Sequence, residues 1–284
     1  MLTTRIIEDA VRGALLEDAP WGDLTVELTI APETRLEAVL CAREPGVFAG
    51  GPLVVEAFRQ TDPSVTVAVL AEEGHAFEQG EVLARIEGPA RGVLTAERVA
   101  LNFAQRLSGI ATLTSRYVAA VSHTGAVIAD TRKTTPGLRA LEKHAVRAGG
   151  GSNHRFGLSD AVMIKDNHLA AIGATDGLAL TDALRALRRR AGHTTSIIVE
   201  VDRPEQLEPV LEAGVTGVLL DNFSLAELEA GVRVVAWRAV CEASGGVNLE
   251  TVAAIADTGV DVISVGRLTH GASALDLGLD AAGG

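Results

Sequence analysis

The second half of the chain alternates short apolar runs with longer amphipathic segments. From residue 126 onward, nearly continuous Val, Ile and Leu runs are separated by stretches with helical periodicity. Apolar strands of this kind are typical of parallel sheets that are covered on both faces. The runs are AVIAD (126–130), AVMIKD (161–166), SIIVEV (196–201), GVLLDN (217–222), RAVCEA (238–243) and DVISVG (261–266). Six such strands are fewer than a complete α/β barrel needs, so the pattern fits an open, incomplete barrel as well as a closed one.

The first part of the chain has a different pattern. Between residues 35 and 92, RLEAVLCARE and SVTVAVLAEE alternate apolar and polar positions, while EPGVFAGG and EEGHAFEQGE are rich in turn residues. This pattern predicts short strands and turns in a small α+β sandwich. The stretch AFEQGEVLARIEG also resembles the hairpin of lipoyl or biotinyl carrier domains. Residues 65–90 contain no lysine to carry such a cofactor, which argues against a carrier domain.

A long helix is predicted between these two regions, over residues 95–122. Thr95 is the expected N-cap, and Glu97 favours the first turn. Arg98, Asn102 and Gln105 share one face of this helix at i, i+4 and i+7 spacing. The ordinary interpretation of these three residues is a solvated polar face.

The overall composition restricts the class of protein. The chain has 284 residues, of which 47% are hydrophobic, enough for one large domain or two modest ones. We expect neither a membrane span nor a signal peptide, because no apolar run reaches the required length and acids interrupt the N-terminal apolar positions. Cys41 and Cys241 are too few for a disulfide framework, so a cytoplasmic location is expected. The net charge of -12 argues against general nucleic-acid binding.

Polar residues stand at the ends of the predicted parallel strands. In a barrel of this type, the carboxyl ends of the strands surround one shared mouth. Residues far apart in the sequence are therefore expected to converge there. The residues that end or follow an apolar run are Asp130, Lys165, Glu200, Asp221 and Ser244.

Positive charge is concentrated between Asp130 and His168. This segment holds seven Lys or Arg against four Asp or Glu, in a chain whose net charge is -12. The chain has three lysines, and all of them lie in this segment. Lys133 and Lys165 stand beside predicted strand ends, where the compact ammonium group is not interchangeable with a guanidinium group. Lys143 lies on a predicted helix and is interpreted as an ordinary helix residue. Within DTRKTTPGLR (130–139), the Pro-Gly pair is the expected turn into the next helix.

Three loops extend this picture of an anion site. RAGGGSNHRFG (147–157) places two donors, His154 and Arg155, beside glycines that allow close approach of the backbone. EASGGVN (242–248) and SVGRLTH (264–270) follow the last two predicted strands, where barrels commonly bind a phosphate group through backbone amides. Together with the cations, these loops indicate a multiply charged anionic substrate.

Glu200 and Asp221 end neighbouring predicted strands. Carboxylates near phosphates commonly hold Mg²⁺ through water, because that ion keeps much of its hydration shell. The same two side chains could instead hydrogen-bond ribose hydroxyls or form a buried ion pair with the basic cluster. Their spacing alone does not distinguish these alternatives.

Taken together, the motifs carry a family resemblance. The stretch DTRKTTPGLRALEKHAVRAGGGSNHRFGLSDAVMIKDNHL is accompanied, in order along the chain, by LEDAPWGDLT, LTAERVALNFAQRLSGIAT, VEVD, LLDNF, EASGG and VGRLTH. This set resembles the quinolinate phosphoribosyltransferases, also called carboxylating nicotinate-nucleotide pyrophosphorylases. The one small departure, EASGG where ESSGG or ESGG is commoner, keeps both glycines.

The resemblance implies a fold and an activity. It implies an N-terminal α/β sandwich over residues 1–112, an open TIM-like α/β barrel over 113–267, and a C-terminal tail over 268–284 that packs back on the N-terminal domain. It further implies a homodimer with shared active sites. The implied reaction transfers phosphoribose from phosphoribosyl pyrophosphate to quinolinate, giving nicotinate mononucleotide, pyrophosphate and CO₂, with Mg²⁺ as cofactor.

The resemblance also implies roles for the matched residues. The two quinolinate carboxylates would be held by Arg132, His154, Arg155 and Lys165, joined by Arg98 from the partner subunit. Lys133 would meet the pyrophosphate, and Glu200 and Asp221 the ribose and the water-bound Mg²⁺. The backbone amides of Gly245, Gly246 and Gly266 would bind the 5′-phosphate, and Ser244 would also contact phosphoribosyl pyrophosphate. Arg139 is a further, less supported candidate for the lining of the site.

Two other functions compete with this interpretation. A nicotinate phosphoribosyltransferase or the molybdenum-transport-associated homologue would have the same fold, and fold alone does not separate them. Nicotinate has one carboxylate and needs fewer cations than the predicted set provides. A non-catalytic anion-binding protein would explain the basic segment but not the two carboxylates, Glu200 and Asp221, expected at the same mouth.

Overall fold

The computed structural model describes residues 2–282, which form two compact units. Unit 1 comprises residues 2–115, 134–150 and 268–282, and unit 2 comprises residues 116–133 and 151–267. Both units are therefore built from segments that are separate in the sequence.

Unit 1 contains a four-stranded antiparallel sheet in the order β12-β1-β5-β3. The strands are β1 (Arg35–Ala42), β3 (Thr66–Val69), β5 (Val82–Pro89) and β12 (Leu277–Ala281), and β2 (Gly46–Val47) pairs separately with β4 (Ala76–Phe77). Alternate residues of β1, namely Ala38, Leu40 and Ala42, are at most 3% exposed, as expected for a sheet with one buried face. The C-terminal segment takes part in this sheet, because Leu40 is paired with Leu279.

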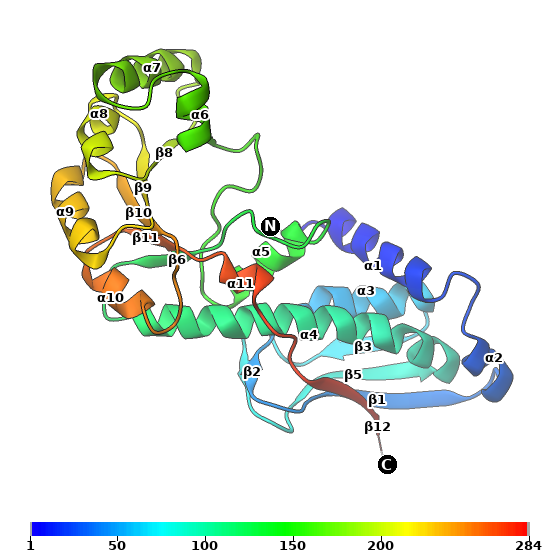
Figure 1. Ribbon diagram of the computed structural model, residues 1–284. Helices are drawn as coiled ribbons and strands as arrows, with labels where there is room; N and C mark the ends of the chain where they lie inside the picture. Colours follow the sequence, from blue (N-terminus) through cyan, green and yellow to red (C-terminus); the bar gives the residue numbers. More distant parts are fainter. Residues whose placement is uncertain (1, 283–284) are drawn as a thin grey trace. The chain divides into compact units, whose positions relative to one another are not determined.

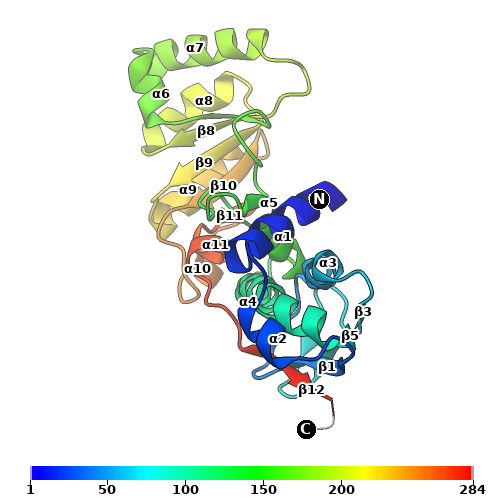
Figure 2. The same cartoon turned by 90° about the vertical axis from the view of Figure 1, so that its right-hand side faces the viewer.

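Helices complete the core of unit 1. They are α1 (Thr4–Asp18), α2 (Leu24–Thr29), α3 (Gly51–Thr61), the first part of α4 (Ala90–Val121) and α5 (Arg139–Ala148). Figure 1 and Figure 2 show α3 and α4 over one face of the sheet. Their buried side chains include Leu53, Phe58 and Leu107. The sandwich of helices and sheet expected for the N-terminal part of the chain is confirmed.

Two details of the predicted secondary structure are wrong. The region interpreted as strands and turns contains the helix α3, which is preceded by Gly50 in a left-handed conformation (φ 109°) and has a proline in its first turn. The long helix begins at Ala90, directly after the strand β5, and not at Thr95. Thr95 lies inside α4, and its hydroxyl donates to Asp23 Oδ2 at 3.3 Å.

Unit 2 contains a six-stranded parallel sheet in the order β6-β11-β10-β9-β8-β7. The strands are β6 (Val127–Ala129), β7 (Val162–Ile164), β8 (Ile197–Val201), β9 (Gly217–Asp221), β10 (Val240–Ser244) and β11 (Val262–Ser264). All six predicted strands are confirmed. Within the described residues β6 and β7 are the two edges and do not pair with each other, so the barrel is open.

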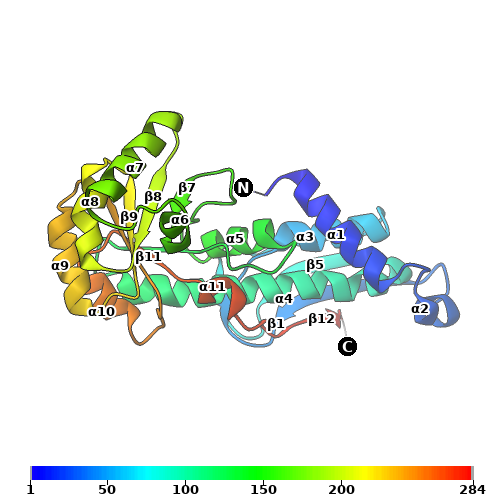
Figure 3. The same ribbon diagram turned by 45° about the horizontal axis from the view of Figure 1, so that its top comes forward.

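Helices lie along one face of this sheet, as Figure 1 and Figure 3 show for α7 to α10. The helical elements that follow the strands are α6 (Asp166–Ala171), α7 (Gly177–Arg190), the 3₁₀ turn η1 (Pro204–Gln206), α8 (Leu207–Glu212), α9 (Leu225–Val235), α10 (Val252–Asp257) and the short α11 (Arg267–His270). The helix-covered face is apolar, and Val218 and Leu220 are fully buried there. Among residues 2–282, no helix is both long enough and apolar enough to cross a membrane.

The pairing register decides which residues share the opposite, inner face. Glu200 is paired with Leu219, and Leu219 with Glu242, so these three form one row across neighbouring strands. Two residues further along, Asp221 is paired with Ser244. Because side chains alternate between faces along a strand, both rows point to the same side. The polar residues of the inner face therefore gather toward the carboxyl ends of the strands.

Residues 134–150 lie in unit 1, although the barrel range expected from the sequence (113–267) includes them. The helix α5 in this segment buries Leu141, Ala145 and Val146. Its fully buried Glu142 accepts a hydrogen bond of 2.7 Å from Arg106 Nη2 of α4. An apolar face and a buried ion pair thus join α5 to the long helix.

Candidate active site

A pocket of about 430 Å³ opens at the carboxyl ends of the strands of unit 2. Four of its lining residues are cations on three different segments: Arg132 and Lys133 after β6, Arg155 in the loop before β7, and Lys165 after β7. Its other lining residues are Thr131, His154, Met163, Glu200, Leu219, Asp221, Glu242, Ser244 and Ser264. The convergence expected from the strand ends is thus seen within one unit.

The two loops that carry most of these cations are joined by Asp130, which is fully buried. Asp130 Oδ1 accepts a hydrogen bond from the His154 N–H (2.9 Å), and Oδ2 accepts one from Asn153 Nδ2 (2.7 Å). The backbone also pairs here, because Ser152 forms a parallel bridge with Ala129. A buried carboxylate that accepts several hydrogen bonds is a rigid connection. Asp130 therefore fixes the segment 152–155 against the end of β6.

The two arginines of the pocket, Arg132 and Arg155, differ in the hydrogen bonds that their guanidinium groups make. Arg132 Nε is buried and makes no hydrogen bond within residues 2–282. Arg155 Nη1 donates to the carbonyl oxygen of Ala161 (3.0 Å). Burial and the nearby positive charge of Arg132 lower the pKa of Arg155, while Asp160 partly opposes this change. Partly buried cations that repel each other are costly, so this arrangement favours an anionic ligand between them.

Lys165 is held in place by its neighbours. Its backbone N–H donates to His168 Nδ1 (3.0 Å) at the start of α6, and its ammonium group is hydrogen-bonded to Glu200 Oε2. The Lys165 side chain is 41% exposed and that of Glu200 is 14% exposed. The ion pair between Glu200 and the basic cluster, one of the alternatives considered for this residue, is therefore present.

An acidic recess of about 330 Å³ adjoins Glu200 and Asp221. It is lined by Asp166, Glu200, Asp202, Gln206, Asp221 and Asn222. Within residues 2–282, no three His, Cys, Asp or Glu side chains are close enough to hold a metal ion directly. Carboxylates around a space of this size match a hydrated Mg²⁺, which keeps most of its water molecules.

The loop after β10 has a backbone that requires glycine. Gly245 and Gly246 have φ values of 97° and 62°, in the left-handed region that L residues rarely adopt. A side chain at Gly245 would also meet Asn222 Oδ1 at 2.1 Å. Ser244, just before them, lines the pocket, whereas Gly266 directly precedes α11. The loop therefore brings backbone close to the pocket at Ser244.

Three cations of the basic segment lie outside unit 2. Arg139, Lys143 and Arg147 are on α5 in unit 1, and Lys143 is only 3% exposed. Arg98 is also in unit 1, where it is exposed on α4. The seven-cation segment therefore contributes four residues to the pocket of unit 2.

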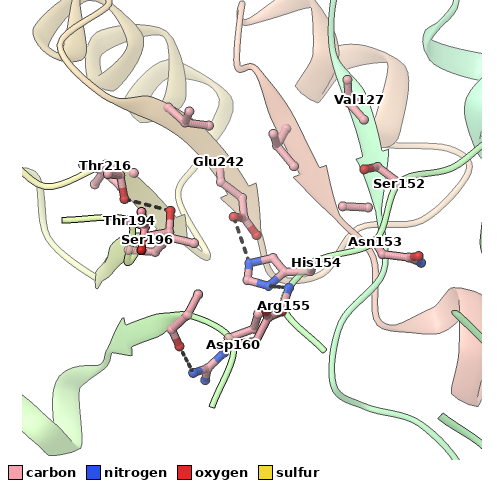
Figure 4. A pocket seen from close by; sticks show the side chains of 17 residues that line it. Val127, Ser152, Asn153, His154, Arg155, Asp160, Thr194, Ser196, Thr216 and Glu242 are labelled. Carbon is pink, nitrogen blue, oxygen red and sulfur yellow. Dashed lines mark hydrogen bonds and ion pairs between the residues drawn. The ribbon is translucent and has the colours of Figure 1, made fainter. Parts of the chain in front are cut away.

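The sequence reasoning missed the acid at the base of this pocket. Glu242 lies on the inner face of β10, is 4% exposed, and has Oε2 3.3 Å from His154 Nε2 (Figure 4). It borders both the pocket and a second cavity of about 470 Å³ toward the amino ends of the strands. The sequence offered one sign of this acid, because Glu242 interrupts the apolar run RAVCEA of a predicted buried strand.

Fold and site together define a class: an open α/β barrel with a cation-lined pocket and an adjacent acidic recess at the carboxyl ends of its strands. Known proteins then define the family. The family model for the N-terminal domain of quinolinate phosphoribosyl transferase matches residues 23–108, and that for its C-terminal domain matches residues 110–280. The chain belongs to the quinolinate phosphoribosyltransferase family.

Individual relatives cover nearly the whole chain. The nicotinate-nucleotide pyrophosphorylase (carboxylating) of Mycobacterium leprae is 44% identical over 279 residues, which are 96% of this chain and 96% of that protein. A Bacillus subtilis protein named "Probable nicotinate-nucleotide pyrophosphorylase (carboxylating)" is 44% identical over 265 residues, 93% of this chain and 90% of its own. The crystal structure of NadC from Streptococcus pyogenes is 38% identical, with a TM-score of 0.93 and 99% of each chain covered.

Proposed function

We propose that this chain transfers phosphoribose from phosphoribosyl pyrophosphate to quinolinate, with loss of CO₂ and formation of nicotinate mononucleotide and pyrophosphate. The observation that carries this proposal is the set of cations in one pocket, with the buried Nε of Arg132 beside Arg155 and Lys165. The family membership supports the same reaction.

Quinolinate is a dianion with two adjacent carboxylates, and the pocket has the complementary charge. A guanidinium group can bind a carboxylate through two parallel hydrogen bonds. Arg132 and Arg155 repel each other in the free protein, since Arg132 contributes to the lowered pKa of Arg155. A dicarboxylate between them would replace this repulsion with attraction. We assign the carboxylates to Arg132, Arg155 and Lys165, with His154 beside them.

The phosphoribosyl group would occupy the other side of the mouth. Lys133 is exposed and lines the pocket, so it is suited to the pyrophosphate. The backbone around Ser244, Gly245, Gly246 and Gly266 is suited to the 5′-phosphate. Glu200 and Asp221 would then face the ribose and stabilise positive charge at its anomeric carbon as pyrophosphate departs.

The bond changes need no protein nucleophile. The ring nitrogen of quinolinate attacks the anomeric carbon, and the bond to pyrophosphate breaks. The alkylated ring nitrogen is then positively charged, so the electron pair left at the adjacent carbon when CO₂ departs is stabilised. A proton finally replaces the carboxylate at that carbon. The contribution of the protein is positioning and charge complementarity.

Mg²⁺ belongs to this proposal as the expected cofactor. When bound, it would neutralise the charge of the pyrophosphate as that group leaves. The acidic recess supports its placement, because Asp166, Glu200, Asp202 and Asp221 provide oxygen acceptors around a space wide enough for coordinated water. Glu200 is already paired with Lys165. If Mg²⁺ and phosphoribosyl pyrophosphate bind there, the Glu200 carboxylate would interact with both Lys165 and the hydrated ion.

The chief alternative is a phosphoribosyltransferase that uses nicotinate. Its substrate has one carboxylate, which a single cation can neutralise, whereas Arg132, Arg155 and Lys165 all line this pocket. Purified protein should therefore form nicotinate mononucleotide and CO₂ from quinolinate, phosphoribosyl pyrophosphate and Mg²⁺. Turnover with nicotinate and none with quinolinate would exclude the proposal.

We further propose that the protein acts as a homodimer in which Arg98 completes the site of the partner subunit. An Arg98→Ala subunit mixed with a Lys165→Ala subunit should then form one intact site per mixed dimer and recover part of the activity lost by each variant alone. Mixed dimers that form, as shown by two different affinity tags on one particle, and yet stay inactive would refute the shared site.

A further inference from the structure

Glu242 is a buried acid that the reaction described above does not use. Its side chain is 6% exposed, and it stands on the inner face of β10 next to Leu219 in the strand register. Its Oε1 is buried and makes no hydrogen bond within residues 2–282. Burying a carboxylate in the middle of a sheet is costly unless a partner compensates it. The partner seen here is His154, through Oε2.

Both ring nitrogens of His154 lie close to groups of the protein. The backbone N–H of Arg155 donates to His154 Nδ1 at 2.7 Å, so Nδ1 carries no proton in this arrangement. The proton of a neutral ring then lies on Nε2, which is buried 3.3 Å from Glu242 Oε2, an ion-pair contact without the geometry of a hydrogen bond (Figure 4).

We infer that Glu242 is a positioning residue for quinolinate binding that acts through His154 on Arg155. Glu242 orients the His154 ring, and the ring in turn holds the N–H of Arg155. Asp130 holds the other side of the same peptide segment through the His154 N–H. The guanidinium group of Arg155, fixed at its far end by Ala161, is thereby aimed into the pocket. This inference rests on the proposed function, because it concerns the affinity for quinolinate.

The chain of contacts predicts which kinetic constant changes. Glu242→Ala removes the carboxylate that faces His154 Nε2 and should raise the KM for quinolinate about tenfold, with the KM for phosphoribosyl pyrophosphate changed less than about twofold. Glu242→Gln retains an oxygen beside Nε2 and should recover most of the affinity that Glu242→Ala loses. Cys241→Ala is the matched control: Cys241 is 2% exposed on the same strand but points to the helix-covered face. It should lower stability and leave both KM values unchanged.

A double-mutant cycle separates positioning from direct binding by His154. If Glu242 acts through His154, then His154→Ala and the double variant with Glu242→Ala should have the same KM for quinolinate, about tenfold above the unmodified protein. If the two effects multiply to about a hundredfold, or if Glu242→Ala raises the KM of both substrates equally, the inference is wrong.

A measurement without turnover keeps this test independent of the proposed function. In protein labelled with ¹⁵N-histidine, the His154 signal, assigned from the His154→Ala variant, should report an unprotonated Nδ1 and a protonated Nε2. Without Glu242 to orient the ring, Glu242→Ala should let it turn away from the Arg155 N–H and so mix the two tautomers, and Cys241→Ala should preserve the single tautomer. A tautomer that is unaffected by Glu242→Ala overturns the inference, whereas a protein without quinolinate turnover overturns only the proposed function.

Discussion

Replacing Asp130 should lower the stability of the protein and its affinity for quinolinate more than replacing an aspartate on the surface. Asp130 is fully buried and accepts hydrogen bonds from the His154 N–H (2.9 Å) and from Asn153 Nδ2 (2.7 Å). Asp130→Ala leaves both donors without this acceptor and removes the charge that accompanies them. Asp130→Asn keeps the shape and one oxygen, but turns an amide NH₂ group toward one of the two donors.

The magnitude follows from these two contacts. A hydrogen bond to a charged group contributes about 1.5–3 kcal/mol, and a buried donor left unsatisfied costs a similar amount. We therefore expect Asp130→Ala to lower the free energy of unfolding by about 3–5 kcal/mol and Asp130→Asn by about 2 kcal/mol. Because the same contacts fix the segment that carries Arg155, the KM for quinolinate should rise in the same order.

Urea denaturation followed by circular dichroism measures the first effect, and initial rates with varied quinolinate measure the second. The control is Asp257→Asn, which changes an ion pair between His123 and Asp257 whose side chains are 51% and 61% exposed. It should cost about 0.5 kcal/mol or less and leave the kinetics unchanged. An Asp130→Ala protein as stable as this control would refute the reasoning.

Three further changes test other parts of the fold. Glu142→Ala should destabilise the protein by about 3 kcal/mol in urea denaturation, since it leaves Arg106 without its buried partner; a loss under about 1 kcal/mol would contradict this. Ala236 ends α9 with φ 45°, so Ala236→Gly should raise the free energy of unfolding by about 1 kcal/mol, and a lowered denaturation midpoint would be inconsistent with that strain. Burial, with Asp261 and Glu242, raises the pKa of Cys241 to about 12. The pKa of the thiol in the unfolded chain is near its usual 9.0, so the contribution of Cys241 to stability is complete below that pH and is lost as the pH rises toward 12. Cys241→Ala should therefore show a smaller fall in stability over this interval, and equal falls in both proteins would refute the assignment.

The strands of unit 2 could be predicted because a parallel strand that is buried on both faces of its sheet consists mostly of apolar residues. Strand ends could be predicted for the same reason, which is why Lys165, Glu200 and Asp221 were expected near one another and are found lining one pocket. The helix α3 was missed because its Leu53 to Phe58 stretch is also compatible with a short buried strand. Local pattern alone does not resolve such a run.

Contacts between distant segments were not predictable from pattern. The ion pair of Lys165 with Glu200 depends on the parallel register of β7 and β8. The place of α5 in unit 1 depends on the ion pair between Glu142 of α5 and Arg106 of α4. The surroundings of the two His154 ring nitrogens depend on the backbone N–H of Arg155 and on Glu242, an acid some ninety residues later in the chain. Each of these requires three-dimensional neighbours that a single sequence does not list.

The pairing of β12 with β1 has a consequence for the order of folding. Residues 35–42 are made early in synthesis, but their neighbour in the sheet, residues 277–281, is made more than two hundred residues later. Until then, β1 is an open edge with unpaired N–H and C=O groups, the kind of edge that recruits other chains. Both segments of unit 2, residues 116–133 and 151–267, lie between these two strands in the sequence. Unit 2 can therefore form its own sheet before β12 has been made. During synthesis, the N-terminal sheet is thus the last part to close and the part most in need of protection from aggregation.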